Sequence, residues 1–136
     1  MLKISEEIVA AIMAHGRREM PNEACGYLAA GPDGVVRHHF ELTNMDRAPD
    51  HFTMNPAEQF AAIRRMREEG LQTAAVYHSH PETPARPSEE DIRLALDPTM
   101  LYVIVSLLPA PNAVRGFRIS QGEAQEEEII IVRSKS

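Results

Sequence analysis

Two histidines separated by one residue, in the run from His78 to Pro81, constrain this chain more than any other feature. The preceding residues, 71–77, are apolar enough to form a buried strand, so the histidines lie at its end. Side chains at positions i and i+2 leave the same face of a strand, with backbones about 6.6–6.8 Å apart. Since imidazole nitrogen binds zinc at about 2.0–2.1 Å, His78 and His80 are placed to share one metal ion. Ser79 faces the other way.

A third ligand can come from the polar segment that follows the histidines. Residues 87–92 read Pro-Ser-Glu-Glu-Asp-Ile and lead into apolar residues that suggest a helix. If the loop of residues 81–87 folds this helix start back over the strand end, Asp91 supplies a carboxylate oxygen. Two nitrogens and one oxygen leave the fourth position of a tetrahedral zinc to water, which is the pattern of a catalytic site.

The same residues also fit a purely structural interpretation. Ser88 followed by Asp91 at the third helical position is a near variant of the capping box, and that alone accounts for both residues. A His-x-His pair at a strand end can also lie on the surface without a metal. Spacing alone therefore leaves both interpretations open.

Composition narrows the class of protein. The 136 residues suit one domain, residues 1–136, with one core. The net charge of −6 and the lack of a basic cluster argue against nucleic acid as a partner. We find no secretory signal and no apolar run of the ~20 residues that would span a membrane, so we expect a cytoplasmic protein.

The single cysteine, Cys25, limits the chemistry further. It rules out an intramolecular disulfide, which fits a reducing compartment. It also excludes any zinc site that needs two cysteines, including the deaminase site with its Pro-Cys-x-x-Cys signature. A buried small hydrophobe is an adequate interpretation of Cys25, and we assign it no chemistry.

Periodicity and turn residues predict the remaining elements. A helix begins after the cap Ser5 and ends before Pro21, with His15 on its apolar face as a packed residue. A second helix runs from the cap Asn55 to Glu69 and is expected to turn Phe60, Ile63 and Met66 towards the core. Strands are predicted in the later half of 22–30 and at 35–42, 52–54, 101–108, 113–120 and 126–132, with turns at 31–34, 109–112 and 121–123.

Together these residues resemble the JAMM motif of the MPN+ metallopeptidases. That motif has a glutamate on an early strand, then His-x-His-Pro, six residues, Ser, two residues and Asp. Glu23, His78, His80, Ser88 and Asp91 occupy these positions at the required spacing, and residues 23–26 are similar to the small prokaryotic members. The resemblance implies an α+β fold with the α/β layering of cytidine deaminases. In that fold a curved, mostly antiparallel or mixed sheet is flanked by about three helices.

The resemblance also implies the roles of the site residues. His78, His80 and Asp91 would bind Zn²⁺. Glu23 would hold the attacking water as general base and then act as acid to the leaving amine. Ser88 would donate a hydrogen bond to the oxyanion.

Family members cleave peptide or isopeptide bonds after the C-terminal Gly-Gly of ubiquitin-like proteins. The small prokaryotic ones are similar to enzymes that free such a tail from a lysine, or that release cysteine from a sulfur-carrier protein. We therefore expect a zinc metallopeptidase whose partner is a carrier ending in Gly-Gly. The loops at residues 43–51 and 82–87 are the expected walls for this tail, which could add as a strand.

Two other functions remain as alternatives. One is a metal-dependent hydrolase of a small amide, with no protein partner. The other is a metal-free MPN-type interaction module, against which the intact ligand set argues. The identity of the carrier, the amine released and the oligomeric state stay open, with a homodimer among the options.

Overall fold

The computed structural model describes residues 1–109 and 113–133. The described residues form a sheet with the strand order β7-β6-β5-β4-β2-β3-β1-β8. Its strands are β1 (Leu2–Ser5), β2 (Cys25–Ala30), β3 (Val35–Leu42), β4 (Gln72–His80), β5 (Leu101–Ser106), β6 (Val114–Ser120), β7 (Glu123–Glu127) and β8 (Ile129–Val132). The helices are α1 (Glu6–Glu19), α2 (Pro56–Glu68) and α3 (Glu89–Leu94). None of the described helices is long and apolar enough to cross a membrane.

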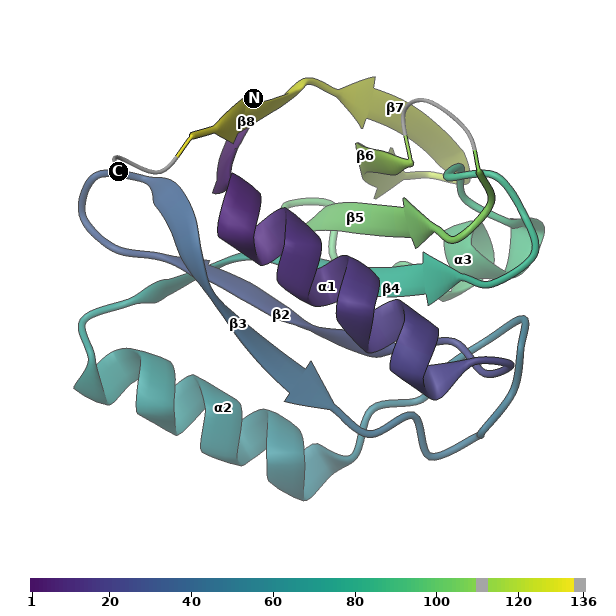
Figure 1. Cartoon of the computed structure of the whole chain (residues 1–136), viewed down its shortest axis with the longest axis horizontal. Coiled ribbons are helices and arrows are strands. Elements are labelled where there is room, and N and C mark those ends of the chain that lie inside the picture. The colour runs from purple at the N-terminus through teal and green to yellow at the C-terminus, as the bar shows by residue number, and fades with distance from the viewer. Residues whose placement is uncertain (110–112, 134–136) are drawn as a thin grey trace.

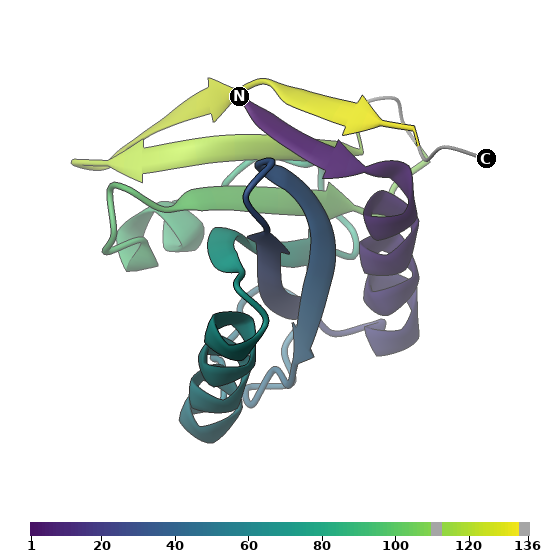
Figure 2. The same cartoon turned by 90° about the vertical axis from the view of Figure 1, so that its left-hand side faces the viewer.

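The sheet is mixed and strongly curved. Antiparallel pairs join β2 to β3 and β4, and β6 to β5 and β7, whereas β1 pairs parallel with β3 and β8, and β4 with β5. Only Glu128 separates β7 from β8, although these strands stand at opposite ends of the strand order. The sheet therefore curls until its two edge strands join end to end at Glu128, with β7 and β8 arching over the other strands (Figure 2). A curved mixed sheet with three helices confirms the expected α+β class.

The helices lie on both faces of the sheet (Figure 1). α1 packs on one face, where Ile8 and Ile12 join a core that includes Tyr77 of β4. α2 packs on the other face through Ala62 and Met66. Because side chains alternate along a strand, Tyr77 faces α1 while His78 and His80 of β4 face the side of α2 and α3.

The prediction that Phe60 and Ile63 face the core was wrong. Phe60 is 73 % exposed and Ile63 is 42 % exposed, whereas Met66 is 2 % exposed as expected. Three residues turn an α-helix by about 300°, so each step from 60 to 63 to 66 falls about 60° short of a full turn. That drift leaves only the end of the row against the sheet, where Ala62 and Met66 form the buried stripe.

Some element boundaries also differ from the prediction. β1 was not predicted, because its partners β3 and β8 are distant in the sequence. The segment expected as one strand at 126–132 forms parts of β7 and β8. The predicted turn at 109–112 falls largely on residues 110–112, which lie outside the described residues. By contrast, β4 ends at His80, so the histidine pair closes the strand as expected.

Candidate metal centre

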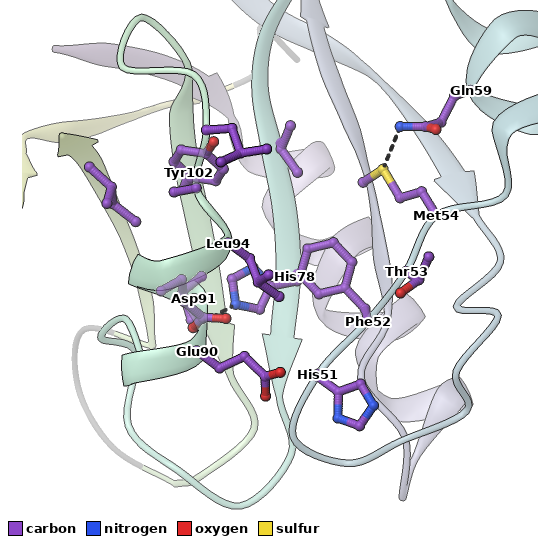
Figure 3. A pocket seen from close by; sticks show the side chains of 15 residues that line it. His51, Phe52, Thr53, Met54, Gln59, His78, Glu90, Asp91, Leu94 and Tyr102 are labelled. Carbon is purple, nitrogen blue, oxygen red and sulfur yellow. Dashed lines mark hydrogen bonds and ion pairs between the residues drawn. The ribbon is translucent and has the colours of Figure 1, made fainter. Parts of the chain in front are cut away.

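Three donor atoms converge where α3 folds over the end of β4. The Nε2 atoms of His78 and His80 lie 3.2 Å apart. Asp91 Oδ2 lies 3.2 Å from Nε2 of His78 and 3.1 Å from Nε2 of His80. Asp91 and His78 point towards each other across the gap between α3 and β4 (Figure 3). Together the three residues form a group that could hold a metal ion.

The hydrogen bonds around His80 prepare its ring for a cation. His80 Nδ1 donates to the carbonyl oxygen of Pro84 at 2.9 Å, since a carbonyl only accepts. In a neutral ring this leaves a lone pair on Nε2, which is the atom directed at His78 and Asp91. An imidazole held in this way by a backbone carbonyl is the usual arrangement of a metal-bound histidine.

His78 is held by burial. Its ring packs against Phe52, with the ring centroids 4.9 Å apart, and its Nδ1 is buried with no hydrogen-bond partner. Burial lowers the pKa of His78, so the neutral ring is favoured. The pKa of Asp91 lies well below its usual range. Burial opposes its charge, but in the metal-free protein hydrogen bonds donated by His78 and His80 outweigh that effect, and a bound metal ion would replace the protons on Nε2.

These donors fit a zinc ion. Donors about 2.0–2.2 Å from one ion at tetrahedral angles lie about 3.3 Å from each other. The observed separations of 3.1 and 3.2 Å are close to that value. Lone pairs that converge at such distances repel one another unless a cation or a proton lies between them, so this donor set is suited to a cation.

The capping box and the converging donors are formed by the same atoms. Asp91 N donates to Ser88 Oγ at 3.0 Å, and Ser88 N donates to Asp91 Oδ2 at 2.9 Å, which closes the capping box at the start of α3. Oδ2 is also the oxygen that faces the two histidines. The structural and the metal-binding interpretations of Asp91 are therefore compatible. Ser88 is exposed, and its Oγ accepts in the box, so the hydroxyl proton stays available to donate.

Glu23 lies just before β2 rather than on it. Its side chain is 2 % exposed, and Oε1 is buried without a hydrogen-bond partner. Burial, followed by the negative charge of Asp91, raises the pKa of Glu23 to about 9. The negative charge of Asp91 thus adds to the effect of burial on Glu23, although the two residues are far apart in the sequence.

Ser79 ties the segment of Glu23 to the histidine strand. Ala24 N donates to Ser79 Oγ at 2.8 Å, and Ser79 N donates to the carbonyl oxygen of Ala24 at 3.0 Å. The residue that alternation turns away from the metal donors thus fixes the backbone beside Glu23. Sequence reasoning placed Ser79 on the correct face but did not find this link.

Asn44 is a second residue that sequence reasoning missed. Its side chain is buried and donates to the carbonyl oxygens of Glu23 and His51 at 3.1 and 3.0 Å. Its Oδ1 accepts from the backbone N–H groups of Asp46 and Thr53 at 3.0 and 3.2 Å. Asn44 therefore holds the loop after β3 against the segment of Glu23. An asparagine two residues before Asp46 could have suggested an Asx turn, but not the longer contacts.

A cavity of about 510 Å³ opens beside the converging donors and includes His78 and Asp91 in its lining (Figure 3). One wall is formed by residues 51–54 and the opposite wall by residues 94–96. Tyr102, Ile104 and Ile119 line it from the sheet. The cavity lining is mostly apolar, and its acidic residues, Glu90 and Asp91, lie together beside His78 (Figure 3).

The expectation about the walls was only partly right. The 43–51 loop reaches the cavity only through His51, and among the described lining residues none comes from 82–87. The latter loop supports the site from behind instead. Its Pro84 carbonyl binds His80, and Ala85 is buried against β5 and β6.

Two residues with potentially reactive side chains, His15 and Cys25, are packing residues, as expected. His15 is buried on α1, with Nδ1 2.7 Å from the hydroxyl oxygen of Tyr77. Cys25 is fully buried, and burial raises the pKa of its thiol to about 12. A thiol with such a pKa stays protonated at neutral pH and is a poor nucleophile.

Comparison with known proteins identifies a family profile and several similar proteins. The sequence profile described as prokaryotic homologs of the JAB domain matches residues 5–120. The chain is similar to the CysO-cysteine peptidase of Mycobacterium tuberculosis, with 38 % identity over 97 % of this chain and 92 % of that protein. It is also similar to a probable TtuB-protein conjugate cleaving protease of Thermus thermophilus, with 28 % identity over 97 % of this chain and 84 % of that protein.

Solved structures share the fold. Protein DSY2949 of Desulfitobacterium hafniense is 41 % identical, with a TM-score of 0.88, and the match covers 98 % of this chain and 94 % of that chain. AF2198, a JAB1/MPN domain protein from Archaeoglobus fulgidus, is 23 % identical, with a TM-score of 0.62 and coverage of 96 % and 97 %. The second likeness supports the fold alone.

Proposed function

The chain belongs to the prokaryotic homologs of the JAB domain, and on that basis we propose that it is a zinc-dependent peptidase of the JAMM type. It cleaves the bond that follows the C-terminal Gly-Gly of a ubiquitin-like or sulfur-carrier protein. The observation that carries this proposal is the convergence of three donor atoms, from His78, His80 and Asp91, beside an open cavity. Two nitrogens and one oxygen are a catalytic zinc ligand set with one open position.

The chain's own residues would carry the proton transfer. A zinc ion, when bound, supplies Lewis-acid polarisation of a carbonyl and makes water more acidic. Glu23 takes a proton from the attacking water as its oxygen bonds to the carbonyl carbon, and passes it to the amine nitrogen as the C–N bond breaks. Burial raises the pKa of Glu23 in the metal-free protein, whereas the positive charge of a bound zinc ion would lower this pKa again and leave the carboxylate able to accept the proton. The Ser88 hydroxyl donates to the oxygen on which negative charge develops.

The cavity suits an extended tail. Residues 51–54 border it, and Met54 forms an isolated β-bridge with Asn44, so the backbone here is close to extended. A peptide tail can add along such a segment as a further strand. Glycines let that tail pass close to the Phe52 and His78 rings. The mycobacterial relative is named for a carrier-cysteine adduct, which makes cysteine the first amine to test as the product.

The metal content of the purified protein tests the ligand assignment. We expect about one zinc per wild-type chain, none in Asp91→Ala and an undiminished amount in Glu23→Gln, because removal of a ligand weakens binding and a change of the base does not. Glu89→Ala, in the same turn of α3, serves as the control and should keep its zinc. Failure of the wild-type protein to take up zinc on reconstitution would refute the peptidase proposal.

A further inference from the structure

The outward side of α2 carries four side chains that form one surface, which we call the α2 stripe. It consists of Phe60, Ile63, Arg64 and Arg67, and they line a shallow hollow of about 240 Å³. These positions are spaced as i, i+3, i+4 and i+7, so they share one face of the helix. Phe60 is 73 % exposed and Ile63 is 42 % exposed. α2 thus presents apolar area to solvent on the side opposite its buried stripe.

The α2 stripe has the composition of a binding surface. In the described part of the chain, no ion pair holds Arg64 or Arg67, whereas Arg65 of the same helix pairs with Glu69 at 3.1 Å. Aromatic residues and arginine are enriched at protein–protein interfaces and among the residues that dominate binding energy. Two unpaired guanidinium groups beside an exposed phenyl ring fit a partner that offers an apolar spot bordered by carboxylates.

The α2 stripe begins one residue after Gln59, which lines the cavity. Gln59 precedes Phe60, lies one helical turn before Ile63 and lines the cavity. Its Nε2 donates to the Tyr27 hydroxyl at 2.9 Å and lies 3.5 Å from Met54 Sδ, which fixes the start of α2 against the cavity wall (Figure 3). His51 lies near Asp91, and Met54 and Gln59 lie at the other end of the cavity (Figure 3), so a tail that runs along residues 51–54 to the metal donors would leave the folded body of the carrier near the start of α2.

A second copy of the chain is a poor occupant of this surface. Two-fold contacts between identical subunits place the same patch against itself. Arg64 and Arg67 of both copies would then share one interface, and like charges brought together oppose association. The occupant is therefore a different protein with complementary charge.

From these observations we infer that the α2 stripe docks the folded body of the carrier protein whose tail enters the cavity. The inference rests on the proposed function. The stripe would contact an apolar spot bordered by acidic residues on the carrier, while the cavity binds the tail. Since the stripe lies away from the metal donors, it would affect binding of the carrier and leave the chemical step unchanged.

Binding of a carrier that has lost its tail tests this inference without any cleavage. The probe is fluorescently labelled Mycobacterium tuberculosis CysO with its C-terminal tail removed, titrated with this protein. We expect measurable binding to the wild type and a loss of about tenfold or more in Phe60→Ser and in Arg64→Glu. Ile131→Ser on β8 and Arg17→Glu on α1 are exposed controls that should bind like the wild type.

Absence of binding to the wild type, or equal binding by the stripe variants, would overturn the docking surface. So would a concentration-dependent dimer in sedimentation that Phe60→Ser abolishes, since a second copy would then cover the stripe. Circular dichroism of each variant confirms folding before the titrations.

Cleavage assays separate the docking surface from the proposed activity. We expect Phe60→Ser to raise KM for the CysO-cysteine adduct about tenfold with kcat unchanged, and to cleave a short Gly-Gly-cysteine tail peptide at the wild-type rate. Equal losses on both substrates would overturn docking. If wild-type protein binds tail-less CysO through the stripe but cleaves neither substrate, the docking surface stands and the peptidase proposal fails.

Discussion

Asp91 shows how much one side chain does at this site. Its Oδ2 accepts the backbone N–H of Ser88 and also faces Nε2 of His78 and His80. The carboxylate is therefore oriented by the helix that it helps to begin. This arrangement fixes one metal donor without a further supporting residue, because the capping box sets the rotamer.

Ionisation of the buried Glu23 carboxyl group lowers the stability of the folded protein, and this effect can be measured. Burial raises its pKa from 4.5 to about 9, so between these values the folded state keeps a proton that the unfolded state has lost. For this group, stability is therefore lost as pH rises from about 4.5 towards 9. Metal-free Glu23→Gln should melt higher than metal-free wild type at pH 8, by about 4 °C or more, and the gap should narrow at pH 5.

Thermal unfolding in the presence of a chelator measures this difference. Glu82→Gln, an exposed carboxylate in the 82–87 loop, is the matched control and should not change the melting temperature. A gap of the same size at pH 5 and pH 8 would show that the buried charge is not its source.

At the scale of elements, the close approach of β2 to its neighbours depends on Gly26. A Cβ added at this position would lie 2.3 Å from the Phe40 carbonyl oxygen on β3 and 2.5 Å from the Tyr77 ring on β4. Backbone cannot move away as a flexible side chain does, so strands that hold Cys25 opposite His78 would have to separate. Gly26 is thus required by packing across three strands.

We expect Gly26→Ala to lower the free energy of unfolding by about 1–3 kcal/mol or more, as overpacking does in other cores. Urea denaturation measures the change. Gly31→Ala, just after the same strand, is the control, since the nearest atom to its added Cβ is 3.8 Å away. Wild-type stability in Gly26→Ala would mean that the strands separate at little cost.

At the scale of the whole molecule, the three metal donors connect the sheet with α3, which are otherwise joined by a loop. His78 and His80 come from the sheet and Asp91 from α3, and the exposed 82–84 segment lies between them. A ligand that binds the folded state alone stabilises it by mass action. Metal bound here would therefore couple the position of α3 to the stability of the sheet.

Added zinc should raise the melting temperature of the metal-free wild type by about 10 °C, corresponding to a few kcal/mol at saturating metal. Asp91→Ala should melt at the same temperature with and without zinc. Differential scanning calorimetry at fixed protein concentration measures both, and an equal rise in the variant would place the stabilising metal elsewhere.

Local spacing predicted much of the site and of the fold. Alternation along β4 put His78 and His80 on one face, and the cap pattern at Ser88 and Asp91 predicted the start of α3. These features depend on backbone periods of two and 3.6 residues, which hold regardless of what lies nearby. The strands in the hairpin and the start of α2 were predictable for the same reason.

Tertiary packing decided the rest. The sequence pattern could not show that Ser79 binds the backbone next to Glu23, or that Asn44 joins that segment to the cavity wall, because the partners lie 55 and 21 residues apart in the chain. Nor could it tell which side of α2 is buried. Periodicity determines which side chains share a face, but only the elements packed against that face determine whether it meets the core, a cavity or another protein.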